Sequence, residues 1–408
     1  MIGRTLSHTV LALIVFIWIV PFVALVTTSL RSETASKTSG FWTAFTPTEL
    51  GHRFSTHDKG EKIKLIELKG NIFDRLNKEA DSFLVSGEVT SIFIKSRVPD
   101  PENPDKTKLI RKLVPPGELM TVRGGSFMFQ ANGDFIWIFP EKTIPKPKKL
   151  DAFINQDAVF GIEAYVEVMF EDKKVPNALI SSFIVTIPAT IIPITIAAFA
   201  AYAFSWMQFP GRDWLFILIV CLMVVPTQLA FLPILKGFSG IASWATALNQ
   251  WLTDCEITKS CQVPSKSFAT LWVTHTAFGL PLAIYLLRNY IVGLPRELLQ
   301  SARIDGANHL QIFIRIVIPL SVPALASFSI FQFLWVWNDL IVALYIGPFE
   351  NTDLVFPIRL EKQLGTYGDQ LHLLNASAVI SMIVPVIVFL SMQRYFIRGL
   401  LAGSVKGG

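Results

Sequence analysis

Apolar residues in this sequence of 408 residues gather in six long runs that polar stretches separate. Each run has about the 20 residues that an α-helix needs to cross the hydrocarbon core of a bilayer. The pattern therefore predicts an all-α polytopic membrane protein with six transmembrane helices. The predicted spans are roughly residues 9–30, 177–205, 214–235, 268–287, 321–346 and 376–393.

The first apolar run lies close to the N-terminus, where a cleaved signal peptide would also lie. It is long, contains Pro21 and lacks a clear small-x-small cleavage site. A signal peptide has a shorter apolar region and such a site. We therefore expect an uncleaved membrane anchor.

Charged residues are concentrated between residues 31 and 175. This segment holds 22 Lys and Arg and 21 Asp and Glu, or 43 charges in 145 positions, whereas the other 263 positions hold 24. Only 16% of the chain is charged, against about 25% in soluble domains, which argues against one ordinary soluble fold. The net charge of +5 does not indicate nucleic-acid binding, because the charged segment itself is nearly neutral.

Basic residues in the short loops predict the orientation. With the N-terminus inside, the short inner segments carry nine Lys and Arg and the short outer loops carry five. Short cytoplasmic loops are enriched in Lys and Arg, whereas long domains are translocated largely regardless of charge. We expect both termini in the cytoplasm and residues 31–175 outside.

The charged segment has the sequence features of β-structure. Residues 127–139 predict a hairpin about Asn132-Gly133, a pair that tolerates the positive φ of a two-residue turn. This turn would place Phe129 opposite Ile136 and Phe127 opposite Ile138. Further strands are expected at Phe83–Lys95 and Tyr165–Phe170.

These strands predict a β-rich or α+β extracytoplasmic domain at residues 47–155, in the first outer loop. His52 and His57 have no evident companions that would complete a metal site. The cysteines suggest little chemistry: Cys221 falls in an apolar span and is expected to pack there. Cys255 and Cys261 share one outer loop, where an oxidising compartment would permit a disulfide, although two free thiols are the alternative.

A cytoplasmic loop at residues 291–320 carries the most informative pattern. Pro295 suits the first position of a short helix, and Glu297 in the first turn suits the helix dipole. Asp305-Gly306 then breaks this helix, Asn308 can cap a second one, and Pro319 is expected to end it. A helix with small side chains at its centre suits a groove in another protein. The alternative is a surface helix that only joins two spans.

The spacing in this loop resembles the coupling loop of permease subunits in binding-protein-dependent ABC importers. That family has Glu-Ala-Ala, three residues, Gly, nine residues and Ile-x-Leu-Pro. Here Gln300-Ser301-Ala302, Gly306 and Ile316-Val317-Ile318-Pro319 stand at the same spacing. The family's Glu is replaced by Gln300, although Glu297 lies one turn earlier. The resemblance implies contact with an ATPase through Glu297, Gln300, Ser301, Ala302, Asp305, Gly306, Ala307, Ile316 and Pro319.

Two further segments, 331–339 and 393–407, resemble the sugar-importer branch, and within it the second permease of maltose and α-glucoside systems. The resemblance covers roughly residues 1–46 and 156–408. It makes 1–46 an anchor with the start of the outer loop, and 156–408 a five-helix permease core. Residues 47–155 look like an insertion into the first outer loop.

The resemblance implies several partners. These are a second permease subunit in a heterodimer, two copies of an ABC ATPase, an extracytoplasmic sugar-binding protein and membrane lipid, but no nucleic acid. The chain has no Gly-x4-Gly-Lys-[Ser/Thr] phosphate loop. We therefore expect no enzyme activity and no cofactor in this chain, with ATP and Mg²⁺ bound by the ATPase.

Polar groups within the spans suggest a path for the cargo. Gln332, Trp335 and Asp339 fall at i, i+3 and i+7 on one helical face, beside Asn338. Gln228 follows Pro226 in the third span. Polar groups bind sugar hydroxyls and aromatic rings stack on sugars. The alternative for each residue is a structural contact between helices.

Three other functions stay open at this stage. The chain could be a membrane-anchored sensor or scaffold that acts through its outer domain. It could belong to an importer of another solute, such as glycerol phosphate. A secondary transporter is also conceivable, but it should show inverted repeats and several buried carboxylates, which the sequence lacks.

Overall fold

The computed structural model describes residues 2–38, 40–58, 67–78, 85–100, 103–122, 125–138, 147–156, 160–171, 174–253, 262–348, 354–366 and 370–404. These residues form two compact units. The first comprises residues 1–168 and 367–379, and we call it the strand-rich unit. The second comprises residues 169–366 and 380–408, and we call it the helical unit.

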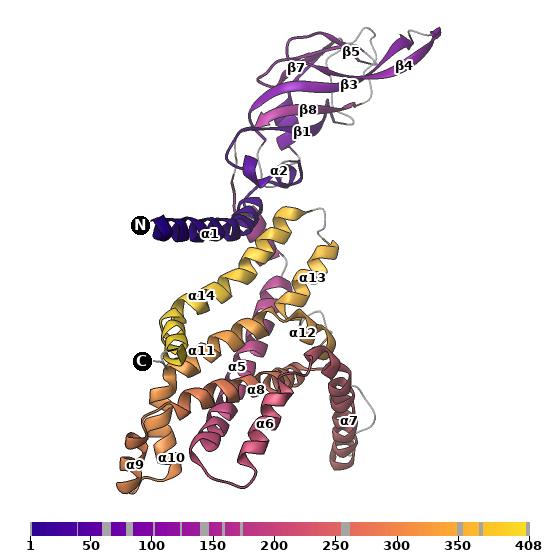
Figure 1. The fold of residues 1–408 in the computed structure, drawn as a ribbon. Coiled ribbons are helices and arrows are strands. Elements are labelled where there is room, and N and C mark those ends of the chain that lie inside the picture. Colours follow the sequence, from indigo (N-terminus) through magenta and orange to yellow (C-terminus); the bar gives the residue numbers. More distant parts are fainter. Residues whose placement is uncertain are drawn as a thin grey trace. The chain divides into compact units, whose positions relative to one another are not determined.

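The strand-rich unit begins with a long apolar helix and continues as two antiparallel sheets (Figure 1). One sheet has the strand order β1-β8-β3-β4 and the other β2-β7-β6-β5. The predicted β-rich character of this region is confirmed. Its elements are α1 (Ile2–Ser29), α2 (Glu33–Thr38), η1 (Phe41–Thr43), β1 (Thr48–Ser55), β2 (Glu67–Asn71), α3 (Ile72–Asn77), β3 (Glu88–Asp100), β4 (Asn103–Val114), β5 (Met120–Val122), β6 (Gly125–Phe129), β7 (Asp134–Ile138), β8 (Lys149–Gln156) and α4 (Glu163–Val166).

Large apolar side chains from both sheets form the core of this unit. Along β7, residues alternate between buried and accessible positions, with Phe135 and Trp137 buried. This period of two is what a half-buried strand requires. The core members with almost no exposed surface include Ile72, Ile92, Phe127, Phe129, Phe135, Trp137, Ala152 and Ile154.

The predicted hairpin exists, but its register is shifted by one residue. Phe129 pairs with Phe135, and Phe127 pairs with Trp137. The turn contains three residues, because Gly133 donates its N–H to the Gln130 carbonyl (3.0 Å) and has φ of 85°. A three-residue loop that ends in a left-handed residue is a common hairpin connection. The shift places four aromatic side chains on one buried face, which the predicted two-residue turn would have divided.

The second predicted strand, Tyr165–Phe170, is wrong. These residues belong to α4 and to a π-helical turn at Glu167–Glu171. Ala164 and Val168 are the buried residues there, and their separation of four is a helical period. In the segment Phe83–Lys95 the strand β3 begins at Glu88, and residues 79–84 lie outside the described residues.

The helical unit contains ten helices and a π-helical turn within the described residues. They are α5 (Lys174–Trp206), α6 (Arg212–Leu222), α7 (Thr227–Thr253), α8 (Phe268–Val292), α9 (Arg296–Ile304), α10 (His309–Ile312), η3 (Phe313–Val317), α11 (Ile318–Asn338), α12 (Leu340–Ile346), α13 (Phe356–Thr366) and, from residue 380 onward, α14 (Leu371–Ser404).

Across the described parts of both units, six helices are long and apolar enough to cross a membrane, so the predicted number is confirmed. Their bounds are Arg4–Ser29, Lys174–Trp206, Thr227–Trp251, Phe268–Val292, His309–Asn338 and Leu371–Arg394. The bounds of two predicted spans are wrong. The third, 214–235, joined α6 to the start of α7, although the helix breaks before Pro226 and resumes at Thr227.

The fifth predicted span, 321–346, crosses a second break. Asp339 has extended backbone (φ −80°, ψ 101°), and its carboxylate accepts the N–H of Val342 at 3.0 Å. It therefore caps the N-terminus of α12, and short polar side chains are preferred at this position. The spanning helix instead extends toward the N-terminus, as far as His309.

Small side chains allow the helices of this unit to approach closely. α5 packs against α8 and α11, and Ala189, Ala197, Ala201 and Ala283 are buried there. Many large apolar side chains point outward instead; Ile191, for example, is 58% exposed. Small residues at helix contacts and large ones at the outer surface are typical of membrane helices, because lipid solvates apolar groups as well as protein does.

Prolines in α5 and α14 leave backbone carbonyl groups without a helical partner, and side chains from other helices donate hydrogen bonds to these carbonyls. A proline has no N–H, so the carbonyl four residues before it loses its helical partner. Such carbonyls precede Pro188, Pro193 and Pro385, and each accepts a hydrogen bond from α8 or α11. The donors are Trp272 Nε1 to the Ile184 carbonyl (2.9 Å), Gln332 Nε2 to the Ala189 carbonyl (3.2 Å) and Trp337 Nε1 to the Ser381 carbonyl (3.2 Å).

Candidate functional site

The loop between α8 and α11 folds as two short helices, as the sequence predicted. α9 begins at Arg296, with Pro295 one position before the helix rather than in it. Glu297 lies in the first turn and Arg303 in the last, which complements the helix dipole. Leu299 is buried in the core that α5, α8 and α10 share, so one side of α9 is anchored.

The chain changes direction at the end of α9, and this turn places a glycine in the left-handed conformation. Gly306 has φ of 83°, and Ala307 donates its N–H to the Ala302 carbonyl at 2.9 Å. This bond spans six residues and defines a Schellman motif, which places glycine at the left-handed position. The predicted break at Asp305-Gly306 is therefore confirmed.

The second helix starts as predicted but does not end as predicted. Asn308 accepts the N–H of Gln311, and the Gln311 side chain accepts the N–H of Asn308, both at 2.9 Å. This reciprocal capping box fixes the start of α10. The helix then runs through Pro319 into α11, because the π-helical turn at Phe313–Val317 accommodates the proline that follows it.

Seven of the predicted coupling residues lie on α9 and the turn that follows it, at one end of the helical unit (Figure 1). Ile316 lies in the π-helical turn and Pro319 at the start of α11. Glu297, Gln300, Ser301, Asp305, Gly306 and Pro319 are exposed, and Ala302, Ala307 and Ile316 are half-buried.

The sequence reasoning missed the apolar residue Ile304, which lies with Leu298 on the accessible side of α9. Ile304 is 87% exposed and Leu298 is 47% exposed. Leu298, Ser301 and Ile304 follow one another at intervals of three, which places them on one helical face. The apolar residues Leu298 and Ile304, in a helix that is otherwise mostly polar, were the signal available in the sequence. The face is a candidate contact surface, because an exposed isoleucine on a polar loop has no partner in the described residues.

The predicted common face of Gln332, Trp335 and Asp339 is wrong, because α11 ends at Asn338 and the backbone turns at Asp339. Gln332 is fully buried, and its amide group donates to carbonyls of α5 and α8. Trp335 is half-buried and lies against Phe331, with 6.1 Å between ring centroids.

Two predicted cargo-path residues are exposed. The Asn338 side chain donates to the Leu334 carbonyl at 2.8 Å and is otherwise accessible. Gln228 is exposed at the start of α7. Cys221 is also exposed, so its predicted packing within the chain is wrong. Cys255 and Cys261 lie outside the described residues.

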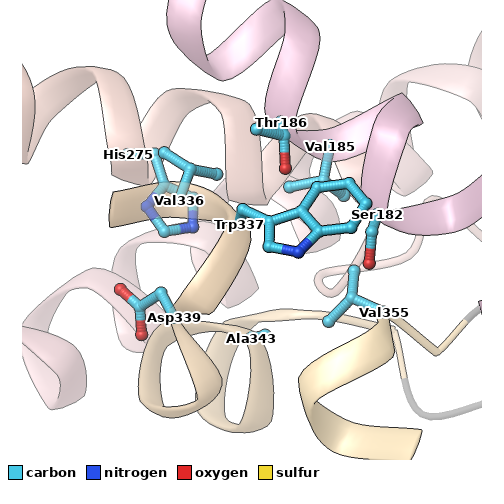
Figure 2. Close-up of a pocket in the computed structure, with 9 residues that line it drawn as sticks. All are labelled: Ser182, Val185, Thr186, His275, Val336, Trp337, Asp339, Ala343 and Val355. Carbon is cyan, nitrogen blue, oxygen red and sulfur yellow. The ribbon is translucent and has the colours of Figure 1, made fainter. Parts of the chain in front are cut away.

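A small cavity with a mixed lining adjoins the break at Asp339 (Figure 2). Figure 2 shows the side chains of His275 and Asp339 on one side of the Trp337 indole. The cavity volume is about 10 Å³, which approaches the space of one water molecule and is far below the 300 Å³ or more of a small-molecule pocket. Its lining residues are Ser182, Val185, Thr186, His275, Val336, Trp337, Asp339, Ala343 and Val355.

Comparison with known proteins identifies the family. The family model of the binding-protein-dependent transport system inner membrane component matches residues 193–401, which include the loop, α11, the C-terminal part of α5 and most of α14. The chain belongs to this family. It is a multi-pass permease of the inner membrane.

Relatives of this permease include several sugar transport proteins. It is 39% identical over 412 residues to the alpha-glucoside transport system permease protein AglG of Rhizobium meliloti, covering 98% of this chain and 97% of that protein. It is 51% identical over 231 residues to the osmoprotective compounds uptake permease protein GgtD of Synechocystis, covering 56% of this chain and 70% of that protein.

A third relative is the trehalose transport system permease protein SugB of Mycobacterium tuberculosis, with 27% identity over 280 residues, 67% of this chain and 91% of that protein. Because the similarity to AglG covers 98% of the permease, it extends through the strands of residues 47–155. That segment is therefore shared with a relative.

Proposed function

We propose that this permease is one of two permease subunits in an ATP-driven ABC importer of carbohydrates, with α-glucosides such as maltose, trehalose or sucrose as cargo. Its partners are the second permease, two copies of an ABC ATPase, an extracytoplasmic sugar-binding protein and membrane lipid. ATP and Mg²⁺ are bound by the ATPase. The printed names of AglG and SugB, an alpha-glucoside and a trehalose permease, support the cargo class.

The accessible face of α9 is the observation that carries the coupling role. Leu299 anchors one side of α9, while Leu298 and Ile304 remain available to a partner. An amphipathic helix that presents exposed apolar residues suits a groove in another protein. Closure of the ATPases would push α9, and the helices joined to it would then expose the cargo path to the other side of the membrane.

The proposed arrangement in the membrane follows from the charges of the loops. Both termini and α9 lie in the cytoplasm, and residues 31–175 lie outside. Residues 47–155 are an insertion into the first outer loop, and 156–408 form the permease core. Asn338, Trp335 and Gln228 are the proposed cargo-path residues, because their side chains are at least partly accessible.

Purification and transport together test this proposal. The tagged permease is extracted gently from its own host, and co-purifying proteins are identified by mass spectrometry. We expect an ATPase and a second permease, and ATP-dependent uptake of labelled maltose, trehalose or sucrose after reconstitution. Recovery of this chain alone, from membranes in which a control transporter stays assembled, would favour a sensor or scaffold.

A substitution in α9 tests the docking face. Ile304→Asp should abolish co-purification of the ATPase, because it places a charge in an apolar contact. Ile162→Asp in the strand-rich unit is the matched control, since Ile162 is 66% exposed but lies far from the loop in sequence. Equal ATPase recovery from both variants would contradict the proposed surface.

The 51% identity to GgtD supports one alternative cargo class, the osmoprotective compounds that its name states. Competition decides between the two classes. Unlabelled α-glucosides should suppress uptake of the labelled α-glucoside, whereas glycerol phosphate and osmoprotective solutes should not. If an osmoprotective solute suppresses this uptake, the cargo is an osmoprotective compound.

A further inference from the structure

Exposed apolar side chains of the strand-rich unit gather in two short segments, residues 40–45 and 160–166. Among the described side chains of residues 30–168, eight large apolar ones are exposed, and five of these lie in the two segments. The other three are scattered along the part of the unit that holds the sheets. We call the five residues in the two segments the apolar patch: Trp42, Phe45, Phe160, Ile162 and Val166.

The helix in the second segment exposes the residues that a water-facing helix would hide. Ile162 and Val166 are exposed, whereas Glu163 and Tyr165 are half-buried. A helix at a water-facing surface normally turns its charged residues outward. Residues four apart lie on one helical face, so α4 and the residue before it present an apolar face. Neighbouring exposed apolar residues mark a surface that contacts protein or membrane.

The two segments form one surface because their side chains and backbones are in contact. The ring centroids of Phe45 and Phe160 lie 5.4 Å apart. Arg31 pairs with Phe160 in an antiparallel bridge. Its guanidinium also donates a hydrogen bond to the Gly40 carbonyl at 3.1 Å, so Arg31 holds both segments.

The apolar patch is attached to the end of a spanning helix. α1 ends at Ser29, and the next carbonyl, that of Leu30, accepts the N–H of Gly161 at 2.9 Å. The hydroxyl groups of Ser29 and Tyr165 are 2.6 Å apart, and Ser29 has no exposed surface. Both contacts are made within one residue of the end of α1. The patch therefore lies at the depth where α1 leaves the apolar part of the membrane.

Lipid is the partner that fits this position. No residue in the most apolar stretch of α1 is buried, so the surface of α1 that is available to lipid continues into the patch. Aromatic residues, Trp above all, are enriched where membrane proteins pass from hydrocarbon to water. Segments with one apolar face lie in this interface with that face toward the acyl chains. Trp42 and the exposed face of α4 have these two properties.

We propose that the apolar patch is a membrane-contact site, which lies at the boundary between headgroups and acyl chains in the leaflet nearest the strand-rich unit. Residues 40–45 and 160–166 touch lipid there without crossing the bilayer. The inference goes beyond the proposed function, because it requires only that α1 spans the membrane. It involves neither the cargo nor the ATPase.

Photo-crosslinking in the host membrane tests the patch. Phe45→benzoylphenylalanine and Val166→benzoylphenylalanine are made in the full chain, one from each segment, and illumination joins the benzophenone to nearby C–H bonds. Mass spectrometry of the purified permease then identifies each adduct as phospholipid or as protein. We expect phospholipid adducts at both positions.

Two control positions set the scale of the yields. Phe16→benzoylphenylalanine, in α1, should give phospholipid adducts, because Phe16 is 65% exposed within the span. Leu119→benzoylphenylalanine is the matched negative control, since Leu119 is 62% exposed in the same unit but lies between β4 and β5. Figure 1 shows these strands at the end of the unit away from α1. The yield at Phe45 and Val166 should be several times that at Leu119.

Two results would overturn the inference. One is a protein adduct in place of phospholipid at either position, which would assign the patch to a protein contact. The other is a phospholipid yield no higher than that at Leu119. If one variant is not recovered from the membrane, Trp42→benzoylphenylalanine replaces it, because Trp42 is also exposed and aromatic. Failure of the permease to co-purify with an ATPase would remove the proposed function and leave this inference intact.

Discussion

The two units of this permease differ in how they pack apolar side chains. In the strand-rich unit the buried residues are large, and Trp137 and Phe127 have at most 1% of their surface exposed. In the helical unit many contacts between α5 and its neighbours are made by alanine, while Ile191 and Phe199 are more than half exposed. The helical unit therefore adds close alanine contacts to a core that also buries large side chains such as Trp337, and it exposes other large side chains.

The difference reflects two solvents. Water drives large apolar groups into the interior of the strand-rich unit. Between membrane helices this driving force is missing, and close packing and hydrogen bonds hold the helices together. The links from Trp272, Gln332 and Trp337 to carbonyls freed by prolines are such bonds. Each proline thus leaves a backbone carbonyl free to accept a hydrogen bond from another helix.

Truncation of a core aromatic residue should have the largest effect. Trp137→Ala should destabilise the strand-rich unit by about 3–5 kcal/mol, the usual cost of replacing a buried aromatic side chain with alanine. Limited proteolysis in increasing denaturant measures this loss. Trp42→Ala is the control, since Trp42 in the same unit is 74% exposed. If the two variants unfold at the same denaturant concentration, the comparison of the units fails.

Removal of a proline link should have an intermediate effect. Gln332→Leu leaves the Ala189 carbonyl without its donor and should destabilise the helical unit by about 1 kcal/mol. Pro193→Ala restores a backbone N–H for this carbonyl, so the double variant should recover most of the loss. Unfolding of the purified permease in mixed detergent measures all three. Purely additive effects would show that the link contributes nothing.

Glycine substitutions should separate backbone strain from crowding. At Gly306 an added Cβ meets no atom within 4 Å, so Gly306→Ala adds only the strain of positive φ, about 1–2 kcal/mol. At Gly133, with φ of 85°, the added Cβ would lie 2.7 Å from the Phe73 ring. Gly133→Ala should therefore cost more, but only Gly306→Ala should reduce coupled uptake. A normal uptake rate would argue against a need for this reversal.

The smallest expected effect is a pH dependence in the strand-rich unit. Burial lowers the pKa of His52, with an opposing contribution from its hydrogen bond to Gln156. The unfolded chain then binds a proton more readily than the folded one, so stability is lost as pH falls through the unfolded value of about 6.5. His52→Gln should reduce the difference in proteolytic stability between about pH 7.5 and 5. If His52→Gln leaves this difference unchanged, other titratable groups cause the pH dependence.

Local sequence signals predicted local structure well. Asn308 and Gln311 cap α10 through their own side chains, and Gly306 supplies the left-handed residue that ends α9. The predicted register of the hairpin was wrong, and the reason is informative. Asn132-Gly133 suits a two-residue turn, but a three-residue turn places Phe127, Phe129, Phe135 and Trp137 together in the core, and burial of that face decides between turns of similar local energy.

By itself, the sequence determined the number of spanning helices, the strand-rich character of the charged segment and the two-helix loop. These features depend on hydropathy, period and caps within a few residues of one another. Only the tertiary structure decided that Gln332 serves a carbonyl of α5, that Asp339 ends a helix, and that Tyr202 meets His309 across 107 positions. These roles depend on which groups from distant segments come into contact. The sequence of one segment shows which of its groups can form hydrogen bonds, but it does not show with which partner.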